Sequence, residues 1–336
     1  MASQATFKAF QYRAGIYARD ADGTFEGAYN TLVSSAALAK LDALCPQIEV
    51  DSSVYAFAGL KGIPEIQPFD GEMQYGGVDQ WTQTAYSNEY GIGVSIRWKD
   101  YKNDQKNMDK YMSSVPGFLA TKAVKHRFEL LARLVEGNPT WEPDAKAIYA
   151  DDHDFGDNQM DVNVIDTTSP TTQDWQTIID AVITRFGTFT DDQGKPLSED
   201  VQMQNMLMLA PSKYSASLRR INAELTIPVV FGSNTAAASK DNIDTGTFKA
   251  LCTPRLTAAN NIVYVVLGNE DYSLIGANAG SGPAFAHTVF DPPTMTAGGG
   301  PDDPVMRNQR ILQTNLYQQV GVTCIAAQRT IKVTLT

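Results

Sequence analysis

The chain has 336 residues, and its proportions of 43% hydrophobic and 19% charged residues predict one large or two ordinary folded domains. The formal net charge of −11 argues against a protein that reads nucleic-acid sequence, because such proteins normally carry a basic face. The N-terminal residues lack the apolar core of a secretory signal, and the longest apolar run, Ile262–Leu267, is far shorter than the ~20 residues that span a membrane. We therefore expect a chain that is synthesised in the cytoplasm and contacts no membrane.

Residues 1–50 are expected to form an N-terminal arm. Their polarity is mixed up to Gly27, and a short helical pattern follows from Tyr29 until Pro46 closes it. We therefore expect helix in the second half of this arm.

The most regular pattern of the chain lies in residues 51–98, which we expect to form an extended loop and its base. From Thr84 to Trp98, large residues alternate with small or polar ones, which predicts one long strand. Residues 66–78 are also extended in pattern, so a long antiparallel hairpin is predicted over about 65–98. At about 3.3 Å per residue the strand would be on the order of 50 Å long, and an isolated two-stranded ribbon is marginal in water. Either its own domain or neighbouring copies must cover it, and the second option makes it an assembly arm.

Residues 99–139 are predicted to be a basic, helix-rich segment. Apolar residues at helical spacing indicate one amphipathic helix over about 117–136, with a shorter helical or irregular lead-in. Pro116 suits the first turn of this helix, and the Gly-Asn-Pro sequence from Gly137 is a stop signal.

The rest of the chain alternates between helical and extended patterns, which predicts a mixed α/β domain over residues 140–305. An amphipathic helix that Gly187 ends is expected in "DWQTIIDAVITRFGTF", and a short helix is expected from Pro211. Strands are expected in "VQMQNMLMLA", "FKALCTPRL" and "NIVYVVLGN". Residues 306–336 are mostly extended again.

No catalytic motif stands out. The sequence contains no GxSxG, HExxH or phosphate-binding loop, and its three cysteines form no CxxC motif. The acidic run from Asp151 to Asp161 includes the candidate metal ligands Asp151, Asp152, His153 and Asp154, since carboxylate and imidazole groups bind metals. Its spacing is not that of an EF-hand, so a solvated loop with an exposed His153 is favoured. We predict no catalytic residue, no cofactor and no metal, and a metal-dependent hydrolase at this cluster is the alternative from another class.

The order of the predicted elements resembles that of a viral shell protein. An arm, a long hairpin, a long helix, a mixed α/β domain and a returning extended segment are similar to the major capsid proteins of tailed phages with the Hong Kong 97 fold, and more narrowly to the Mu-like major head subunits. The stretches that carry this resemblance are "SIRWKDYKND", "ATKAVKHRFELLARLVEGN", "IYADDHDFGD", "MLMLAPSKYSASLRRI" and "LYQQVGVTCIAAQRTIKV". An α+β fold of the Hong Kong 97 type is therefore expected.

The resemblance also implies a division of the chain and a function. Residues 51–98 would be the extended loop, residues 99–139 the peripheral domain with its spine helix, residues 140–305 the axial domain, and residues 306–336 C-terminal strands that return to the peripheral domain. The implied function is a major head protein, not an enzyme, which self-assembles as hexamers and pentamers into an icosahedral virion shell in the host cytoplasm. Scaffold, portal and decoration proteins are further candidate partners, and DNA would be enclosed without specific binding.

The nearest alternative is a shell protein of a bacterial nanocompartment, which is encapsulin-like and of the same fold. Such proteins usually begin with a short helix, whereas about 50 residues precede the predicted hairpin here, which favours the phage protein.

Candidate subunit contacts are the large aromatic residues of the predicted hairpin and the basic residues of the predicted spine helix. They are Tyr75, Trp81, Tyr86, Tyr90, Trp98, Lys122, Lys125 and Arg133. The resemblance also raises a covalent link, because some heads of this fold join subunits by an isopeptide bond from a lysine of the extended loop. Residues 65–98 contain no lysine, and arginine cannot replace it because its guanidinium stays protonated. We therefore expect a shell without that bond.

Overall fold

The computed structural model describes most of the chain, and no helix among the described residues is long and apolar enough to cross a membrane. The described residues are 2–61, 79–150, 153–155, 158–159, 164–167, 174–189, 206–219, 249–257, 261–267, 283–298 and 303–335.

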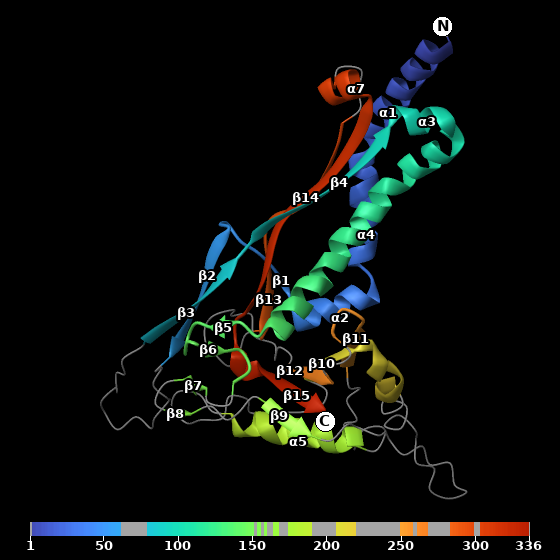
Figure 1. The fold of residues 1–336 in the computed structure, drawn as a ribbon. Helices are drawn as coiled ribbons and strands as arrows, with labels where there is room; N and C mark the ends of the chain where they lie inside the picture. The colour runs from blue at the N-terminus through green and yellow to red at the C-terminus, as the bar shows by residue number, and fades with distance from the viewer. Residues whose placement is uncertain are drawn as a thin grey trace, which may run out of the picture.

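A four-stranded sheet and two long helices form the elongated half of the molecule (Figure 1). The strand order is β1-β13-β14-β4, in which β1 and β13 are parallel and the other pairs antiparallel. The helices α1 and α4 run side by side along one face of this sheet, and Phe25, Leu119 and Leu316 meet in the apolar layer between them. The bounds are α1 Ala2–Val33, β1 Gln47–Glu49, β4 Asn88–Arg97, α4 Gln105–Gly137, β13 Phe285–Ala297 and β14 Ile311–Cys324.

A five-stranded mixed sheet forms the core of the other half, with the strand order β11-β10-β12-β15-β9. The period-two pattern of β10 explains how this sheet is buried on both faces. Met206 and Met208 pack with helix α5 on one face, whereas Leu207 and Leu209 join the core below α4 on the other. The bounds are β9 Val164–Thr167, α5 Asp174–Thr188, β10 Met206–Pro211, β11 Lys249–Thr253, β12 Ile262–Leu267 and β15 Thr330–Leu335.

The predicted fifteen-residue strand is divided at Ser87, and its two parts lie in different sheets. Strand β3 (Asp79–Tyr86) pairs with β2 (Val54–Lys61) in a two-stranded ribbon, whereas β4 pairs with β14. The chain changes partner because the Ser87 N–H donates to the Ser53 carbonyl oxygen at 2.8 Å, and its hydroxyl lies 3.0 Å from that of Thr288. The predicted hairpin was therefore wrong in its pairing, and its proposed first strand, residues 66–78, lies outside the described residues.

The long helix is longer than predicted. Helix α4 begins at Gln105, where the Asp104 side chain accepts a hydrogen bond from the N–H of Asn107, so Pro116 lies inside the helix and not in its first turn. The predicted stop is confirmed, because Asn138 ends the helix with φ of 44°, in the left-handed region.

Residues 2–27 are helical, which the sequence pattern did not indicate. Helix α1 buries a narrow stripe that includes Phe10, Ala14, Ala21 and Phe25, all at most 2% exposed. This helix packs along α4 and strand β13.

The C-terminal segment links the two halves, because β14 belongs to the four-stranded sheet and β15 to the five-stranded one. The remaining elements are short. They are α2 (Ala36–Leu44), α3 (Trp98–Asn103), β5 (Thr140–Trp141), β6 (Lys146–Ala147), β7 (Asp154–Phe155), β8 (Asn158–Gln159), a 3-10 turn at Ser212–Tyr214, α7 (Pro304–Gln309) and a 3-10 turn at Ala327–Arg329.

Candidate functional site

The aromatic residues predicted at subunit contacts fall into two groups. Trp81 and Trp98 are 6% and 8% exposed, because Trp81 packs in the core below α4 and Trp98 packs among aromatic residues of α1 and α3. The structure therefore places both in the core of the chain itself, where a neighbouring copy cannot reach them. Tyr86 is 59% exposed and Tyr90 is partly buried, so both lie at the surface. Tyr75 lies outside the described residues.

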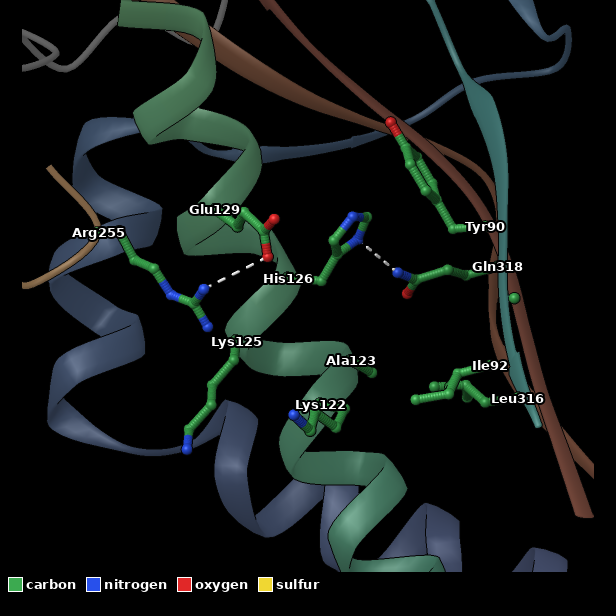
Figure 2. A pocket seen from close by; sticks show the side chains of 11 residues that line it. Tyr90, Ile92, Lys122, Ala123, Lys125, His126, Glu129, Arg255, Leu316 and Gln318 are labelled. Carbon is green, nitrogen blue, oxygen red and sulfur yellow. Dashed lines mark hydrogen bonds and ion pairs between the residues drawn. The ribbon is translucent and has the colours of Figure 1, made fainter. Parts of the chain in front are cut away.

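Helix α4 and strand β4 enclose an open groove of about 280 Å³, which we call the α4–β4 groove (Figure 2). Tyr90 and Ile92 of β4 form its sheet wall together with Leu316 of β14, while α4 supplies Lys122 and Lys125 on the opposite wall. The alternation of β4 explains this placement, because its even-numbered residues face the helices and its odd-numbered residues face away.

The α4–β4 groove carries an excess of positive charge in a chain that is acidic overall. Lys122 and Lys125 are exposed, and the Lys122 amine lies 5.3 Å from the centre of the Phe118 ring. Arg255 reaches the groove from the segment after β11, and its Nη1 lies 3.5 Å from Oε2 of Glu129 (Figure 2). Three cationic groups thus face one carboxylate, an arrangement suited to a carboxylate-bearing segment.

His126 is the titratable group between the two walls of the groove. Its ring lies edge-on to that of Tyr90 with 4.3 Å between the ring centres, and Gln318 Nε2 donates to its Nδ1 at 2.7 Å (Figure 2). Burial lowers the pKa of His126, and the carboxylate of Glu129 opposes this effect. The imidazole is therefore neutral at pH 7, as an acceptor of the Gln318 hydrogen bond must be.

Arg133, the third predicted basic contact, lines a different groove. This second groove, of about 400 Å³, lies between the ribbon and the C-terminal end of α4, and Tyr86 also lines it. On its floor, the N–H and hydroxyl of Thr84 donate to Glu142 Oε2 at 2.7 and 2.8 Å, which ties the ribbon to the segment after α4. Two neighbouring grooves are therefore lined by five of the predicted contact residues, Tyr86, Tyr90, Lys122, Lys125 and Arg133, and Tyr90 lines both grooves.

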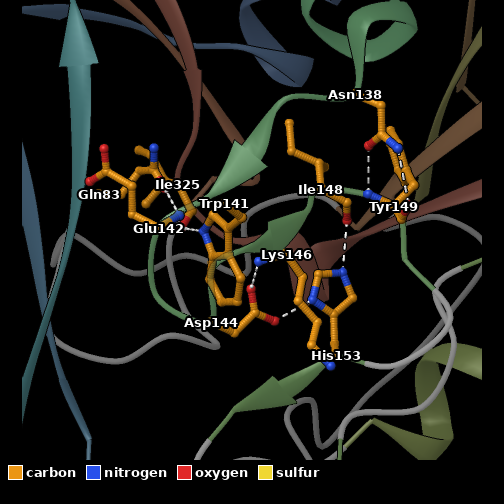
Figure 3. Close-up of polar contacts among 10 residues, drawn as sticks. All are labelled: Gln83, Asn138, Trp141, Glu142, Asp144, Lys146, Ile148, Tyr149, His153 and Ile325. Carbon is orange, nitrogen blue, oxygen red and sulfur yellow. Dashed lines mark hydrogen bonds and ion pairs between the residues drawn. The ribbon is translucent and has the colours of Figure 1, made fainter.

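His153, whose polar contacts are drawn in Figure 3, is fully buried, so the prediction of an exposed histidine was wrong. Its Nδ1 lies 2.5 Å from Oδ2 of Asp144, and its Nε2 lies 2.9 Å from the carbonyl oxygen of Ile148. Both ring nitrogens therefore lie within hydrogen-bond distance of protein oxygen atoms, and neither points to an open ligand position. Among the described residues no group of three or more potential ligands could hold a metal ion, and Asp151 and Asp152 lie outside them.

A buried basic cluster, which no sequence pattern indicated, lies between α4, α2 and β13. Arg127, 4% exposed, pairs with Asp42 of α2 at 2.6 Å, while its Nε and Nη1 have no hydrogen-bond partner among the described residues. His287 of β13 is 3% exposed, and both of its ring nitrogens likewise lack a partner in the described part. Burial, with the nearby charge of Arg127 and that of His126 once it is protonated, lowers the pKa of His287 to about 3.

Comparison with known proteins identifies the fold. No protein-family model matches the chain, and no curated protein matches it. Among solved structures, the capsid of the cyanophage P-SCSP1u matches with a TM-score of 0.53 and 10% identity over 86% of this chain and 85% of that one. The capsid of a native GTA particle matches with a TM-score of 0.52 and 10% identity over 89% and 90%. A virus-like particle from Pyrococcus furiosus matches with a TM-score of 0.50 and 9% identity over 94% and 99%.

The chain therefore has the predicted α+β fold of the Hong Kong 97 type. At 9–10% identity these matches establish the fold, and they cover nearly the whole length of both chains.

Proposed function

We propose that the chain is the major capsid protein of a tailed phage, a subunit that self-assembles into the icosahedral shell around phage DNA. The observation that carries this proposal is the match in fold, over almost the full chain, to proteins described as capsids. Because fold alone does not determine function, the surface chemistry has to agree. Two features of the surface support contacts between copies. Two grooves are open to solvent, and large apolar side chains are exposed, among them Tyr12 (71% exposed) and Phe118 (53% exposed).

The grooves support a specific mode of contact between copies. Residues 62–78 contain Glu65, Asp70 and Glu72 and no lysine or arginine, so this segment carries a charge of −3. The α4–β4 groove has the opposite charge, through Lys122 and Lys125. We propose that the acidic segment of one copy contacts this groove of the next, with Tyr75 in the arriving segment. Tyr86 and Arg133 would contact the same neighbour at the second groove.

The function implies partners and a location. Copies would associate as hexamers and pentamers in the host cytoplasm and end in the virion, with portal, scaffold and decoration proteins as further partners. DNA would be held by enclosure, in keeping with the net charge of −11. The narrower relation to Mu-like head subunits rests on the quoted sequence stretches alone.

We propose that the chain is divided into an extended loop within residues 51–98, a peripheral domain around α4, and an axial domain around the five-stranded sheet. The subunit would be structural and carry out no catalysis, in keeping with a buried histidine–carboxylate pair, Asp144 and His153, whose contacts hold the segment after α4.

Size-exclusion chromatography with light scattering, followed by nuclease treatment, tests the proposal. We expect a species of megadalton mass from the purified chain, and nuclease-protected DNA inside particles from infected cells. Particles that enclose protein cargo and no DNA would favour the nanocompartment alternative. A stable monomer that retains a stoichiometric divalent ion after dialysis would contradict the capsid proposal and support the hydrolase.

A further inference from the structure

We propose that strand β4 pairs with β4 of a second copy, antiparallel and across a two-fold axis at Gly93. Two four-stranded sheets would then join into one continuous sheet of eight strands. The inference rests on the proposed self-assembly, and it adds a surface and a register that the fold match does not specify.

Strand β4 is the edge of its sheet, because β14 lies on one side of it and, within the described ranges, no strand lies on the other. The Trp98 N–H donates to the Arg310 carbonyl oxygen at 2.9 Å, in the same register as the β4–β14 ladder. In an antiparallel ladder, opposite residues that exchange hydrogen bonds alternate with opposite residues that do not. Because Trp98 is hydrogen-bonded to its opposite residue, the even-numbered residues of β4 also bond to β14. The N–H and C=O groups that point to the free edge belong to Glu89, Gly91, Gly93, Ser95 and Arg97, and all five residues are exposed.

This free edge lacks the features that prevent strand pairing. Folded proteins protect edge strands with lysine, proline, bulges or inward-pointing charges, and between Tyr90 and Ile96 strand β4 has none of these. Its outward-facing side chains in that stretch are the small ones of Gly91, Gly93 and Ser95, so another strand can approach closely.

Charge and apolar contacts select one register. With Gly93 opposite Gly93 of the second copy, Glu89 lies opposite Arg97 at both ends of the pair, and the five edge residues meet in hydrogen-bonded pairs. The same register places Ile92, 39% exposed, opposite Val94 of the second copy. A shift by two residues separates Glu89 from Arg97 and leaves both charges without a partner. A second copy of this chain is therefore the occupant that the edge fits.

Cysteine cross-linking of the full-length chain tests the register. Opposed Gly93→Cys residues would have Cα atoms about 5.5 Å apart, within the range that a disulfide bridges. Ser95→Cys, on the same face of β4, is the matched control, because its two copies would lie about 13 Å apart along the strands. At Gly93 a Cβ would lie 2.9 Å from the Asn315 Oδ1 atom, the end of a side chain that can move aside.

With Cys252, the partly exposed cysteine, replaced by serine in every chain, we expect under mild oxidation a reductant-sensitive dimer from Gly93→Cys. Little dimer is expected from Ser95→Cys or from the chain without an added cysteine, in which Cys45 and Cys324 are buried. Equal dimer yields from the two variants, or no dimer from Gly93→Cys, would overturn the pairing. If Gly93→Cys forms particles without the disulfide, the pairing is refuted while the capsid proposal stands.

A charge exchange in the Gly93→Cys chain gives a second readout with exposed residues. Arg97→Glu alone and Glu89→Arg alone place like charges opposite each other, so each should lower the dimer yield, and the double variant should restore it. Failure of the double variant to recover would also refute this register.

Discussion

Acidification should destabilise the folded subunit through His287. The ring is buried beside Arg127 and His126, both from α4, and Arg127 is paired with the carboxylate of Asp42. Burial disfavours the charged form of the ring, and the nearby charge of Arg127 adds to this effect, so the pKa of His287 falls from 6.5 to about 3. The unfolded chain binds a proton below about pH 6.5 whereas the folded chain does not, so stability is full above that pH and decreases as pH falls towards 3.

The size of this effect follows from the shift in pKa. Between pH 7.5 and 5.0 the free energy of unfolding should fall by about 2 kcal/mol from His287 alone, at 1.36 kcal/mol per pKa unit. His287→Leu should remove this loss. It should also leave stability at pH 7.5 unchanged or higher, because neither ring nitrogen has a hydrogen-bond partner among the described residues.

Urea unfolding at pH 7.5 and 5.0 measures the loss of stability on acidification and the stability of the variant at pH 7.5. The chain is kept below the concentration at which it assembles. His126→Gln is the matched control, since the pKa of His126 is also lowered but its ring is only half buried and accepts from Gln318. A His287→Leu variant that loses as much stability as the unmodified chain between pH 7.5 and 5.0 would refute the reasoning.

Three further predictions concern packing, assembly and cross-linking. Gly321→Ala should lower the free energy of unfolding by about 1–3 kcal/mol, because the added Cβ would lie 2.1 Å from the Tyr86 carbonyl oxygen. Urea titration measures this loss, and an unchanged midpoint of unfolding would contradict the close contact. Lys122→Glu should reduce the assembled fraction in light scattering without changing the circular-dichroism spectrum, whereas Lys106→Glu, outside the groove on the same helix, should not; equal effects would argue against the groove. Particles boiled in detergent and reductant should give a single band near 36.7 kDa, because residues 65–98 contain no lysine; a ladder of covalent multimers would disprove this.

Local patterns predicted those elements whose apolar period matches the face that they bury. Strand β10 alternates between two cores, and helix α5 presents Trp175, Ile178 and Val182 to one of them, so their spacing alone identified them. The Gly-Asn-Pro stop after α4 is equally local. The order of such elements was sufficient to predict the fold class, which the structural matches confirm.

The features that sequence reasoning missed depend on distant partners. Strand β4 pairs with a strand more than 200 residues away, so the alternation from Thr84 to Trp98 gave no sign that the chain changes sheets at Ser87. Helix α1 buries a stripe too narrow to stand out among polar residues, and its exposed glycines resemble breakers. His153 stands in an acidic run that looks solvated, yet Asp144 and a backbone carbonyl group hold it inside.

The same dependence applies to the candidate site. Lys122 and Lys125 were predicted correctly as exposed groups on one helix face, but Arg255 joins them from a segment more than 120 residues later. Trp81 and Trp98 were predicted as subunit contacts because they are large aromatic residues of the predicted hairpin, and the elements that bury them could not be placed from the sequence.

Electron microscopy of the purified full-length chain tests the central claim most directly. The account predicts closed shells of uniform diameter built from hexamers and pentamers, with the two-fold contacts between subunits formed by paired β4 strands. A chain that stays monomeric, or that forms only irregular aggregates, under conditions in which its circular-dichroism spectrum is that of a folded protein would contradict the account.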